Sequence, residues 1–266
     1  MSGKKKKEIP KFDGSIIETH CHLDYLKQMP LDELLEKCSA YGIEKILSIT
    51  VNPENLERVL DLARVHQQIY CTQGVHPHDA RLFEAETKEQ ITANCADPKV
   101  LAVGEIGLDF HYSHSAHDIQ IDVFEQQLEL SVQLNLPVVI HSRDADDEMI
   151  ASLKKFSGKI RGVIHSFTSG QKLADFALQE GLYLGFNGII TFNSAQNVRD
   201  VLDQTPIDRI LVETDSPFLT PTPFRGRENA PFYLPLVIQK IADQKNLPVE
   251  ELIKTTTQNA VNLFRF

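Results

Sequence analysis

The sequence has no long apolar run and no abrupt change of composition along its 266 residues. No apolar stretch approaches the ~20 residues that a membrane-spanning helix needs. No stretch joins a charged start, an apolar middle and a small-residue cleavage site, as a signal peptide does. No linker rich in Gly, Ser or Pro divides the chain. These absences predict a protein without a membrane partner and with one main domain over residues 12–266.

Cysteine is scarce, and its spacing carries no motif. The four cysteines, Cys21, Cys38, Cys71 and Cys95, are scattered and form no C-x-x-C pair. Their spacing indicates neither a disulfide framework nor a cysteine zinc site. A reducing compartment fits this pattern best, so we expect the protein in the cytoplasm.

Positive charge is also in short supply. Lys and Arg number 27 against 37 Asp and Glu, which gives a net charge of −10. This balance argues against a broad basic surface for nucleic acid, but it allows an enzyme that uses bound cations and a local cluster of arginines. The one strong basic run, Lys4–Lys7, lies in residues 1–11, which we expect to be a disordered basic tail. A targeting or phosphate-contacting role for this run stays open.

Short β-branched runs alternate with amphipathic stretches along the rest of the chain. The predicted strands are residues 15–19, 45–51, 69–75, 100–107, 137–141, 161–167, 182–188 and 209–215. Helical spacing is clearest over 121–132 and 249–264. This alternation predicts a parallel sheet with helices on both faces, and eight strands close into a (β/α)8 TIM barrel. An open doubly wound sheet usually carries a glycine-rich loop after its first strand, where this chain has "ETHCHLD".

Ionisable side chains cluster where the predicted strands end. They are His20, His22, His76, His78, Glu105, Asp109, His141, Arg143, His165, Glu213 and Asp215. A single residue of this kind is usually a helix cap or a surface group, but six strands share the feature. In a barrel the carboxyl ends of the strands meet at one mouth, where such enzymes carry out chemistry. The other histidines, at positions 66, 111, 114 and 117, are expected to face solvent.

The stretch "ETHCHLD" (18–24) places alternate residues on one side of a strand. Glu18, His20, His22 and Asp24 share that side, and two imidazoles with oxygen ligands nearby suit a divalent metal. The full set of histidines and carboxylates exceeds what one tetrahedral zinc takes. It suits two metals that share a carboxylate, about 3.5–4 Å apart. The mixture of nitrogen and oxygen ligands leaves Zn, Mn and Mg open.

Seven motifs in order carry a family resemblance. They are "ETHCHLD" (18–24), "GVHPHDA" (74–80), "AVGEIGLDF" (102–110), "PVVIHSRDA" (137–145), "VIHSF" (163–167), "ETDSPFLTP" (213–221) and "TTQNAVNLF" (256–264). Together they span nearly the whole chain. The sequence resembles the TatD family of metal-dependent deoxyribonucleases, within the amidohydrolase superfamily.

The resemblance implies a role for each matching residue. One metal would be held by His20, His22 and Asp215, the second by His141 and His165, and Glu105 would bridge the two; His76 and Asp109 would be pocket residues; Arg143, Arg225 and Arg227 would contact phosphates. As a hypothesis, Asp215 takes the proton of a metal-activated water. Three departures from the family pattern, Glu18, Glu228 and Ala230, leave phosphate affinity less defined than the fold.

The expected activity is hydrolysis of DNA phosphodiester bonds, by trimming single strands from the 3′ end, with a link to DNA repair. A monomer is favoured. The alternative enzyme is a barrel that hydrolyses a lactone, a cyclic amide or a phosphotriester. Glu105 favours the nuclease, because many small-molecule members place a modified lysine there. A third reading is a catalytically silent barrel kept as a binding protein.

Overall fold

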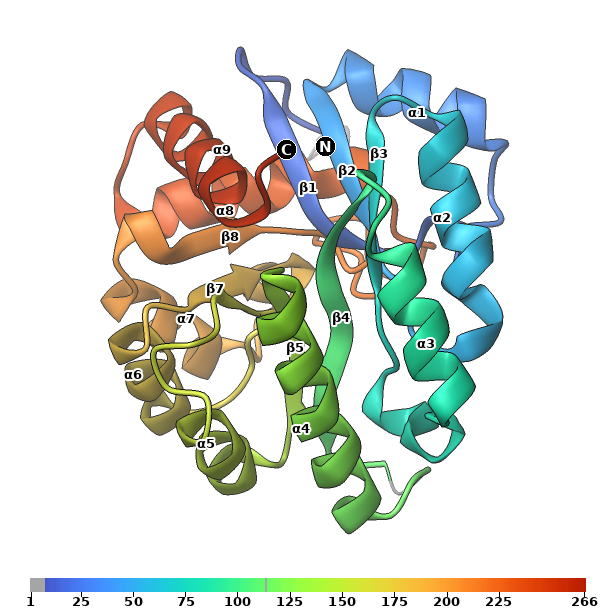
Figure 1. The fold of residues 1–266 in the computed structure, drawn as a ribbon. Coiled ribbons are helices and arrows are strands. Elements are labelled where there is room, and N and C mark those ends of the chain that lie inside the picture. Colours follow the sequence, from blue (N-terminus) through green and yellow to red (C-terminus); the bar gives the residue numbers. More distant parts are fainter. Residues whose placement is uncertain (1–7, 113) are drawn as a thin grey trace, which may run out of the picture.

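The computed structural model describes residues 8–112 and 114–266. Eight parallel strands form one sheet, and each strand pairs with the next along the chain. The strands are β1 Ile16–Cys21, β2 Ile43–Ser48, β3 Ile69–Gln73, β4 Val100–Asp109, β5 Val138–Arg143, β6 Gly162–Ile164, β7 Tyr183–Phe186 and β8 Ile210–Val212. The predicted (β/α)8 barrel is confirmed (Figure 1).

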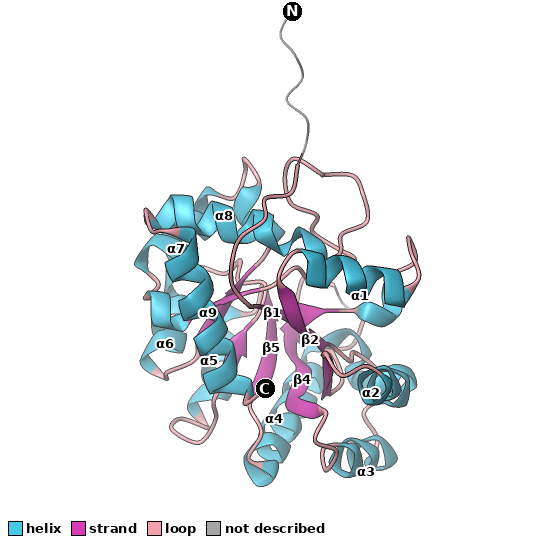
Figure 2. Cartoon of the chain, turned by 90° about the horizontal axis from the view of Figure 1, so that it is seen from above, coloured by secondary structure: helices cyan, strands magenta, loops and turns pink. Residues whose placement is uncertain are grey.

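Helices alternate with the strands and surround them, as the view from above shows (Figure 2). They are α1 Leu31–Ala40, α2 Leu56–Val65, α3 Ala85–Asn94, α4 His117–Leu134, α5 Asp146–Lys154, α6 Gln171–Gln179, α7 Gln196–Gln204, α8 Leu234–Lys245 and α9 Val249–Phe264. Both helices predicted from apolar spacing are present, as α4 and α9. The apolar positions from Val249 to Phe264 all lie within α9.

The barrel closes where β1 meets β8. An isolated parallel bridge joins Cys21 to Ser216, and the Thr19 hydroxyl donates to the Val212 carbonyl at 3.0 Å. The backbone N–H of Asp215 donates to the carbonyl of His20 at 2.9 Å. The first and last strands therefore meet directly beside the motif residues.

Several strands end sooner than predicted. The expected strands over 161–167 and 209–215 shorten to β6 and β8, because the backbone leaves the extended conformation after them. Ser166 has φ 46° and Asp215 has φ 56°, both in the left-handed region. The polar residues of these motifs therefore lie at turns beyond the regular strands, although His165 and Glu213 still donate backbone hydrogen bonds to neighbouring strands.

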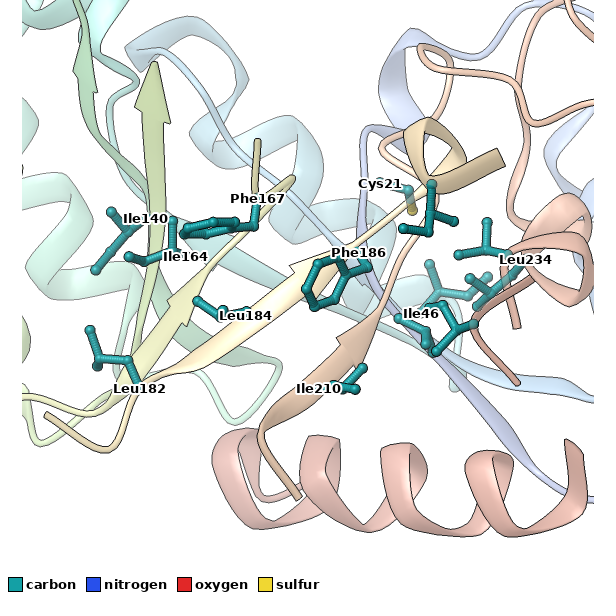
Figure 3. Packing of buried hydrophobic residues seen from close by; sticks show 14 of the residues in the cluster. Cys21, Ile46, Ile140, Ile164, Phe167, Leu182, Leu184, Phe186, Ile210 and Leu234 are labelled. Carbon is teal, nitrogen blue, oxygen red and sulfur yellow. The ribbon is translucent and has the colours of Figure 1, made fainter. Parts of the chain in front are cut away.

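The main core lies between the outer face of the sheet and the helices. Its apolar side chains are almost fully buried, as close-packed interiors require. Figure 3 shows Ile140, Ile164, Leu184 and Ile210 on neighbouring strands. Leu234, at the start of α8, belongs to the same cluster.

A second, smaller core closes the barrel at the end opposite the carboxyl ends of the strands. Leu263 and Phe264 of α9 cluster with residues near the starts of strands, among them Ile17, Leu101 and Tyr183. In Figure 1, α9 lies beside α8 and near β8. This core supports the barrel without taking part in the mouth.

The predicted N-terminal tail, residues 1–11, falls only partly within the described residues. Lys4–Lys7 lie outside the described residues, and Ile9 and Phe12 lie against the main core. The division into a tail over 1–11 and one domain over 12–266 stays a prediction. Over residues 8–112 and 114–266, no helix combines the length and the apolar character needed to cross a bilayer.

Candidate metal centre

The Glu105 carboxylate lies at the middle of a group of imidazoles. Glu105 comes from β4 and is 3% exposed. Its Oε1 lies 2.8 Å from His165 Nε2, 2.9 Å from His141 Nδ1 and 3.4 Å from His76 Nε2. The ends of β3, β5 and β6 therefore converge on one oxygen of this carboxylate.

The other oxygen of Glu105 faces the histidines of the first motif. Its Oε2 lies 3.4 Å from His20 Nε2 and 3.9 Å from His22 Nε2. Asp215 Oδ1 approaches the same two nitrogens, at 3.7 Å and 3.5 Å. The six residues for which the sequence predicted metal binding are thus brought together around Glu105.

The donor set fits divalent metal ions. Among the described residues, three groups have ligand atoms that all lie within 4.8 Å of one another: His20, Glu105 and His165; His20, His22 and Asp215; and His76, Glu105 and His141. Both ring nitrogens of His20 are buried without a hydrogen-bond partner. Buried polar atoms normally have a partner, so Nε2, which faces Glu105 and Asp215, is best explained as a metal ligand.

Burial and neighbouring charges shift the pKa values of these groups in both directions. Burial acts to lower the pKa of three of the imidazoles, that of His165 among them, but nearby carboxylates raise it. Burial acts to raise the pKa of Glu105, but the imidazoles of His165 and His76 hold it well below its usual range. Burial and the nearby His165 lower the pKa of His20, and burial lowers that of His76 to about 4. An ionised carboxylate and a neutral imidazole are the forms that bind metals.

Asp109, the last residue of β4, holds His141 in place. Its Oδ2 lies 3.0 Å from Nε2 of both His141 and His78. Its Oδ1 accepts hydrogen bonds from the backbone N–H groups of His111 and Tyr112. A proton on His141 Nε2 would face the carboxylate and leave the Nδ1 lone pair directed at the centre.

Glu213 supports His165 in a similar way. Its Oε1 accepts from the backbone N–H of Ser166 at 2.6 Å and lies 3.7 Å from His165 Nδ1. A Cβ at position 185 would lie 2.4 Å from Glu213 Oε2, so only glycine leaves room for this carboxylate. Gly185 on β7 is therefore part of what positions the centre.

Two carboxylates of the first motif do not reach the centre. Oε1 of Glu18 accepts from the backbone N–H groups of His20 and Thr214, and burial raises the pKa of Glu18 to about 8. Asp24 pairs with Arg58. The strand alternation therefore brings only the two histidines of this motif to the centre, because β1 ends at Cys21 and the chain turns away.

The histidines outside the strand ends lie at or near the surface. His111, His114 and His117 are exposed, and His66 is half-buried. His111 Nδ1 lies 2.9 Å from Asp144. None of the four is among the described residues that line the cavity over the centre.

The centre opens into a cavity of about 760 Å³, and only one of the predicted arginines lines it. Arg143 lies on the wall. Arg225 instead stacks over the Phe192 ring at 3.8 Å, and Arg227 lies 5.6 Å from the Phe224 ring. Both arginines follow β8, but Arg225 packs on the loop after β7 and Arg227 packs within its own loop.

Apolar and aromatic side chains on the cavity wall escaped the sequence prediction. They are Tyr25, Val51, Tyr112, Ile189, Phe218 and Leu219. Tyr25 follows directly after the first motif, and Phe218 lies inside "ETDSPFLTP". Their place in the motifs was a usable signal, but an aromatic residue in a motif is read as core unless its exposure is known.

The comparison with known families decides the identity of this site. The profile of the family described as "TatD related DNase" matches residues 17–265. The chain belongs to this family. It is therefore a metal-dependent hydrolase, and the centre around Glu105 lies where the motifs of the family converge.

Relatives of the TatD family match along almost the whole chain. An "Uncharacterized metal-dependent hydrolase YabD" of Bacillus subtilis (strain 168) is 37% identical over 252 residues, which cover 94% of this chain and 99% of that protein. A "3'-5' ssDNA/RNA exonuclease TatD" of Citrobacter rodentium (strain ICC168) is 34% identical, over 88% of this chain and 91% of its own. The crystal structure of YJJV, a TatD homologue from Escherichia coli K12, superimposes with a TM-score of 0.88 at 31% identity. It covers 94% of this chain and 98% of that one.

Proposed function

We propose that the protein is a metal-dependent deoxyribonuclease that trims single-stranded DNA from its 3′ end. The observation that carries this proposal is the approach of four histidines to the two oxygens of Glu105, with Asp215 beside two of them, His20 and His22. Support comes from the relative named as a 3′-5′ exonuclease on single-stranded DNA and RNA, with which this chain shares 34% identity.

Two divalent metal ions, Mg, Mn or Zn, would complete the site. His20, His22 and Asp215 would hold one, and His141 and His165 the other, with Glu105 shared between them. Metals in such a pair lower the pKa of water and polarise the oxygens of a phosphate. Nothing in the donor set selects one of the three metals.

Two side chains of the centre would move or hold protons. Asp215 lines the cavity, and we assign it as the general base that takes a proton from the attacking water. His76 Nδ1 accepts from the backbone N–H of His78 at 3.1 Å. Its proton therefore lies on Nε2, which points to the centre and can donate to a phosphate oxygen.

Cations on the protein would hold the neighbouring phosphate. Arg143 is exposed on the cavity wall, and its planar guanidinium matches phosphate oxygens. Arg225 and Arg227 stay candidates for phosphates further along the strand, since both are exposed. With a net charge of −10, such local cations matter more than the overall field.

Replacement of Asp215 by Asn tests the assigned base. We expect a folded protein whose kcat on end-labelled single-stranded DNA falls by about 10²–10⁴, because the amide cannot take the proton. The matched control is Asp118→Asn, at an exposed position in the first turn of α4, which should keep wild-type turnover. Wild-type activity in Asp215→Asn would remove Asp215 as the base.

A substrate panel separates the nuclease from the alternatives. Single-stranded DNA, duplex DNA, RNA and a set of lactones and phosphotriesters should be tested with Mn²⁺, Mg²⁺ and Zn²⁺. We expect a ladder of products shortened from the 3′ end of single-stranded DNA. Turnover of a lactone in place of DNA would assign the chain to the small-molecule hydrolases.

The setting of the activity is part of the same proposal. The cysteines are free thiols, three of them buried, which suits the reducing cytoplasm. We propose a monomer that acts in DNA repair or degradation. Light scattering at assay concentration tests the monomer, and loss of the protein should slow recovery of cells from DNA damage.

A further inference from the structure

Phe218 is an exposed aromatic side chain beside the metal centre. Most large apolar residues are buried, but Phe218 is 51% exposed and lines the cavity. It lies three positions after Asp215 in the turn that follows β8. Exposure of a phenyl ring costs free energy unless a ligand covers it.

The backbone under Phe218 is held firmly. Its N–H donates to the Asp215 carbonyl at 2.9 Å, and its carbonyl accepts from Asn229 Nδ2 at 2.6 Å. The Asn229 side chain also donates to the Thr214 carbonyl at 2.8 Å and is fully buried. The backbone that carries the ring is therefore fixed relative to Asp215, so ligand binding needs to order only the side-chain torsions of Phe218.

One ring contact of Phe218 is recorded among the described residues, and it leaves room for a base. The edge contact is with His22, whose centroid lies 6.1 Å away at 68°. Tyr25 stacks on the same imidazole at 5.5 Å. On another part of the cavity wall, Tyr112 already has Arg143 over its ring at 4.8 Å. Phe218 is therefore the freer of the two strongly exposed rings.

Charge disfavours the neighbouring side of the mouth as a path for nucleic acid. A second cavity of about 720 Å³ shares Arg143 and Thr168 with the first, but four carboxylates line it: Asp144, Asp146, Asp147 and Glu148. Its Lys172 is already paired with Asp147 at 2.6 Å. Phosphates would be repelled there, which disfavours that cavity as the path of the bound strand.

We propose that Phe218 is the stacking platform for the nucleobase next to the phosphate that the metal centre hydrolyses. The proposal rests on the proposed nuclease function and names a residue that would bind the base of the substrate strand. Every base has a π-face, so a phenyl platform would hold any sequence equally and suit an enzyme that removes successive nucleotides. A duplex end, whose bases are already stacked, would use the platform poorly.

The competing explanation is that Phe218 only covers His22 with apolar surface. Leucine would still provide cover, whereas tryptophan would still provide a π-face. The test therefore compares Phe218→Ala, Phe218→Leu and Phe218→Trp. The substrates are two single-stranded oligonucleotides, one normal and one with tetrahydrofuran abasic residues at its last three 3′ positions.

Stacking predicts a specific pattern of kcat/KM. On the normal strand, Phe218→Ala and Phe218→Leu should each lose about 5- to 150-fold, and Phe218→Trp should stay near wild type. On the abasic strand the wild type should lose a similar factor, and Phe218→Ala should lose little more. Val65→Ala is the matched control, since Val65 is 76% exposed on α2 and does not line the cavity.

Three results would overturn the proposal. Equal activity of Phe218→Ala and the wild type on the normal strand would refute stacking and leave the nuclease function intact. Full activity in Phe218→Leu, or equal losses on both strands, would show that the ring only shields the centre. If the wild type cleaves neither strand with Mn²⁺, Mg²⁺ or Zn²⁺ bound, the nuclease function itself fails, and the platform fails with it.

Discussion

At the scale of single residues, Asp109 shows how a carboxylate outside the proposed metal ligands can control one of those ligands, the imidazole of His141. One of its oxygens accepts two backbone N–H groups, and the other faces Nε2 of His141 and of His78. Because the backbone donors bind Oδ1, Oδ2 is the oxygen that faces the two histidines. The tautomer of His141 is therefore set by the loop after β4.

Asp109→Asn should weaken metal binding. The two backbone N–H groups would select the amide oxygen, so the NH₂ group would face His141 Nε2 and push its proton to Nδ1. We expect metal affinity to fall by about 10–100-fold, measured by calorimetric titration of the metal-stripped protein. The control is Asp144→Asn, which removes an exposed partner of His111 and should leave affinity unchanged. Unaltered affinity in Asp109→Asn would show that the carboxylate does not set the tautomer.

The residue scale is also where prediction from the sequence was incomplete. His20, His22, Glu105, His141, His165 and Asp215 could be predicted, because parallel strands bring their carboxyl ends together whatever the loops do. Phe218 could not, since its exposure depends on how the turn after β8 folds. The stacking of Arg225 on Phe192 has the same cause, because it joins the loops that follow β8 and β7.

At the scale of elements, two lysines each donate to three backbone carbonyls at or after the end of a crossover helix. Lys99, just before β4, donates to the carbonyls of His66, Gln67 and Ile69 at 2.9 Å each, beyond the end of α2. Lys245 donates in the same way to three carbonyls at and beyond the end of α7. Lys245 therefore satisfies carbonyls in the last turn of α7 that lack an intrahelical partner, whereas Lys99 satisfies carbonyls of the connection between α2 and β3.

Lys99→Met should destabilise the barrel without touching the metal centre. Three carbonyls lose a charged donor, so we expect the free energy of unfolding in urea to fall by about 1–3 kcal/mol. Activity per folded molecule should stay at the wild-type level. Lys254→Met, at an exposed position of α9, is the control and should change stability by less than about 0.5 kcal/mol. An unchanged urea midpoint for Lys99→Met would mean that water replaces the lysine at no cost.

The existence and order of the strands could be predicted from the sequence, but the residues at which some strands end could not. Strands buried on both faces read as continuous apolar runs, which is why all eight appear near their predicted positions. The runs over 161–167 and 209–215 continue into polar motifs that look extended in sequence. Ser166 and Asp215 instead have positive φ, and the amino-acid composition of these runs does not predict this backbone conformation.

At the scale of the whole molecule, the candidate metal centre draws its residues from strands spread around the barrel. Its residues come from β4 and β5 and from the ends of β1, β6 and β8, so bound ions would cross-link strands from every part of the sheet. In their absence, buried imidazoles and carboxylates must share a small space. Binding and folding should therefore be strongly coupled.

Removal of metal with a chelator should lower the melting temperature. At a metal concentration 100 times Kd, binding adds about 2.7 kcal/mol, which corresponds to about 5–10 °C for a chain of this size. Differential scanning calorimetry before and after addition of Mn²⁺ or Zn²⁺ measures the shift. The double variant His20→Ala/His22→Ala should show a smaller shift. No bound metal on elemental analysis, together with no shift on titration, would revive the silent barrel.

The seam between β1 and β8 has a consequence for the order in which the protein is made. The centre needs His20 and His22, near the start of the chain, and Asp215, about two hundred residues later, and the two segments meet through the bridge of Cys21 to Ser216. A nascent chain on the ribosome therefore has an incomplete centre until its eighth strand has emerged. Unfinished chains would therefore lack hydrolytic activity, and activity would arise only after the segment that contains Asp215 had been synthesised.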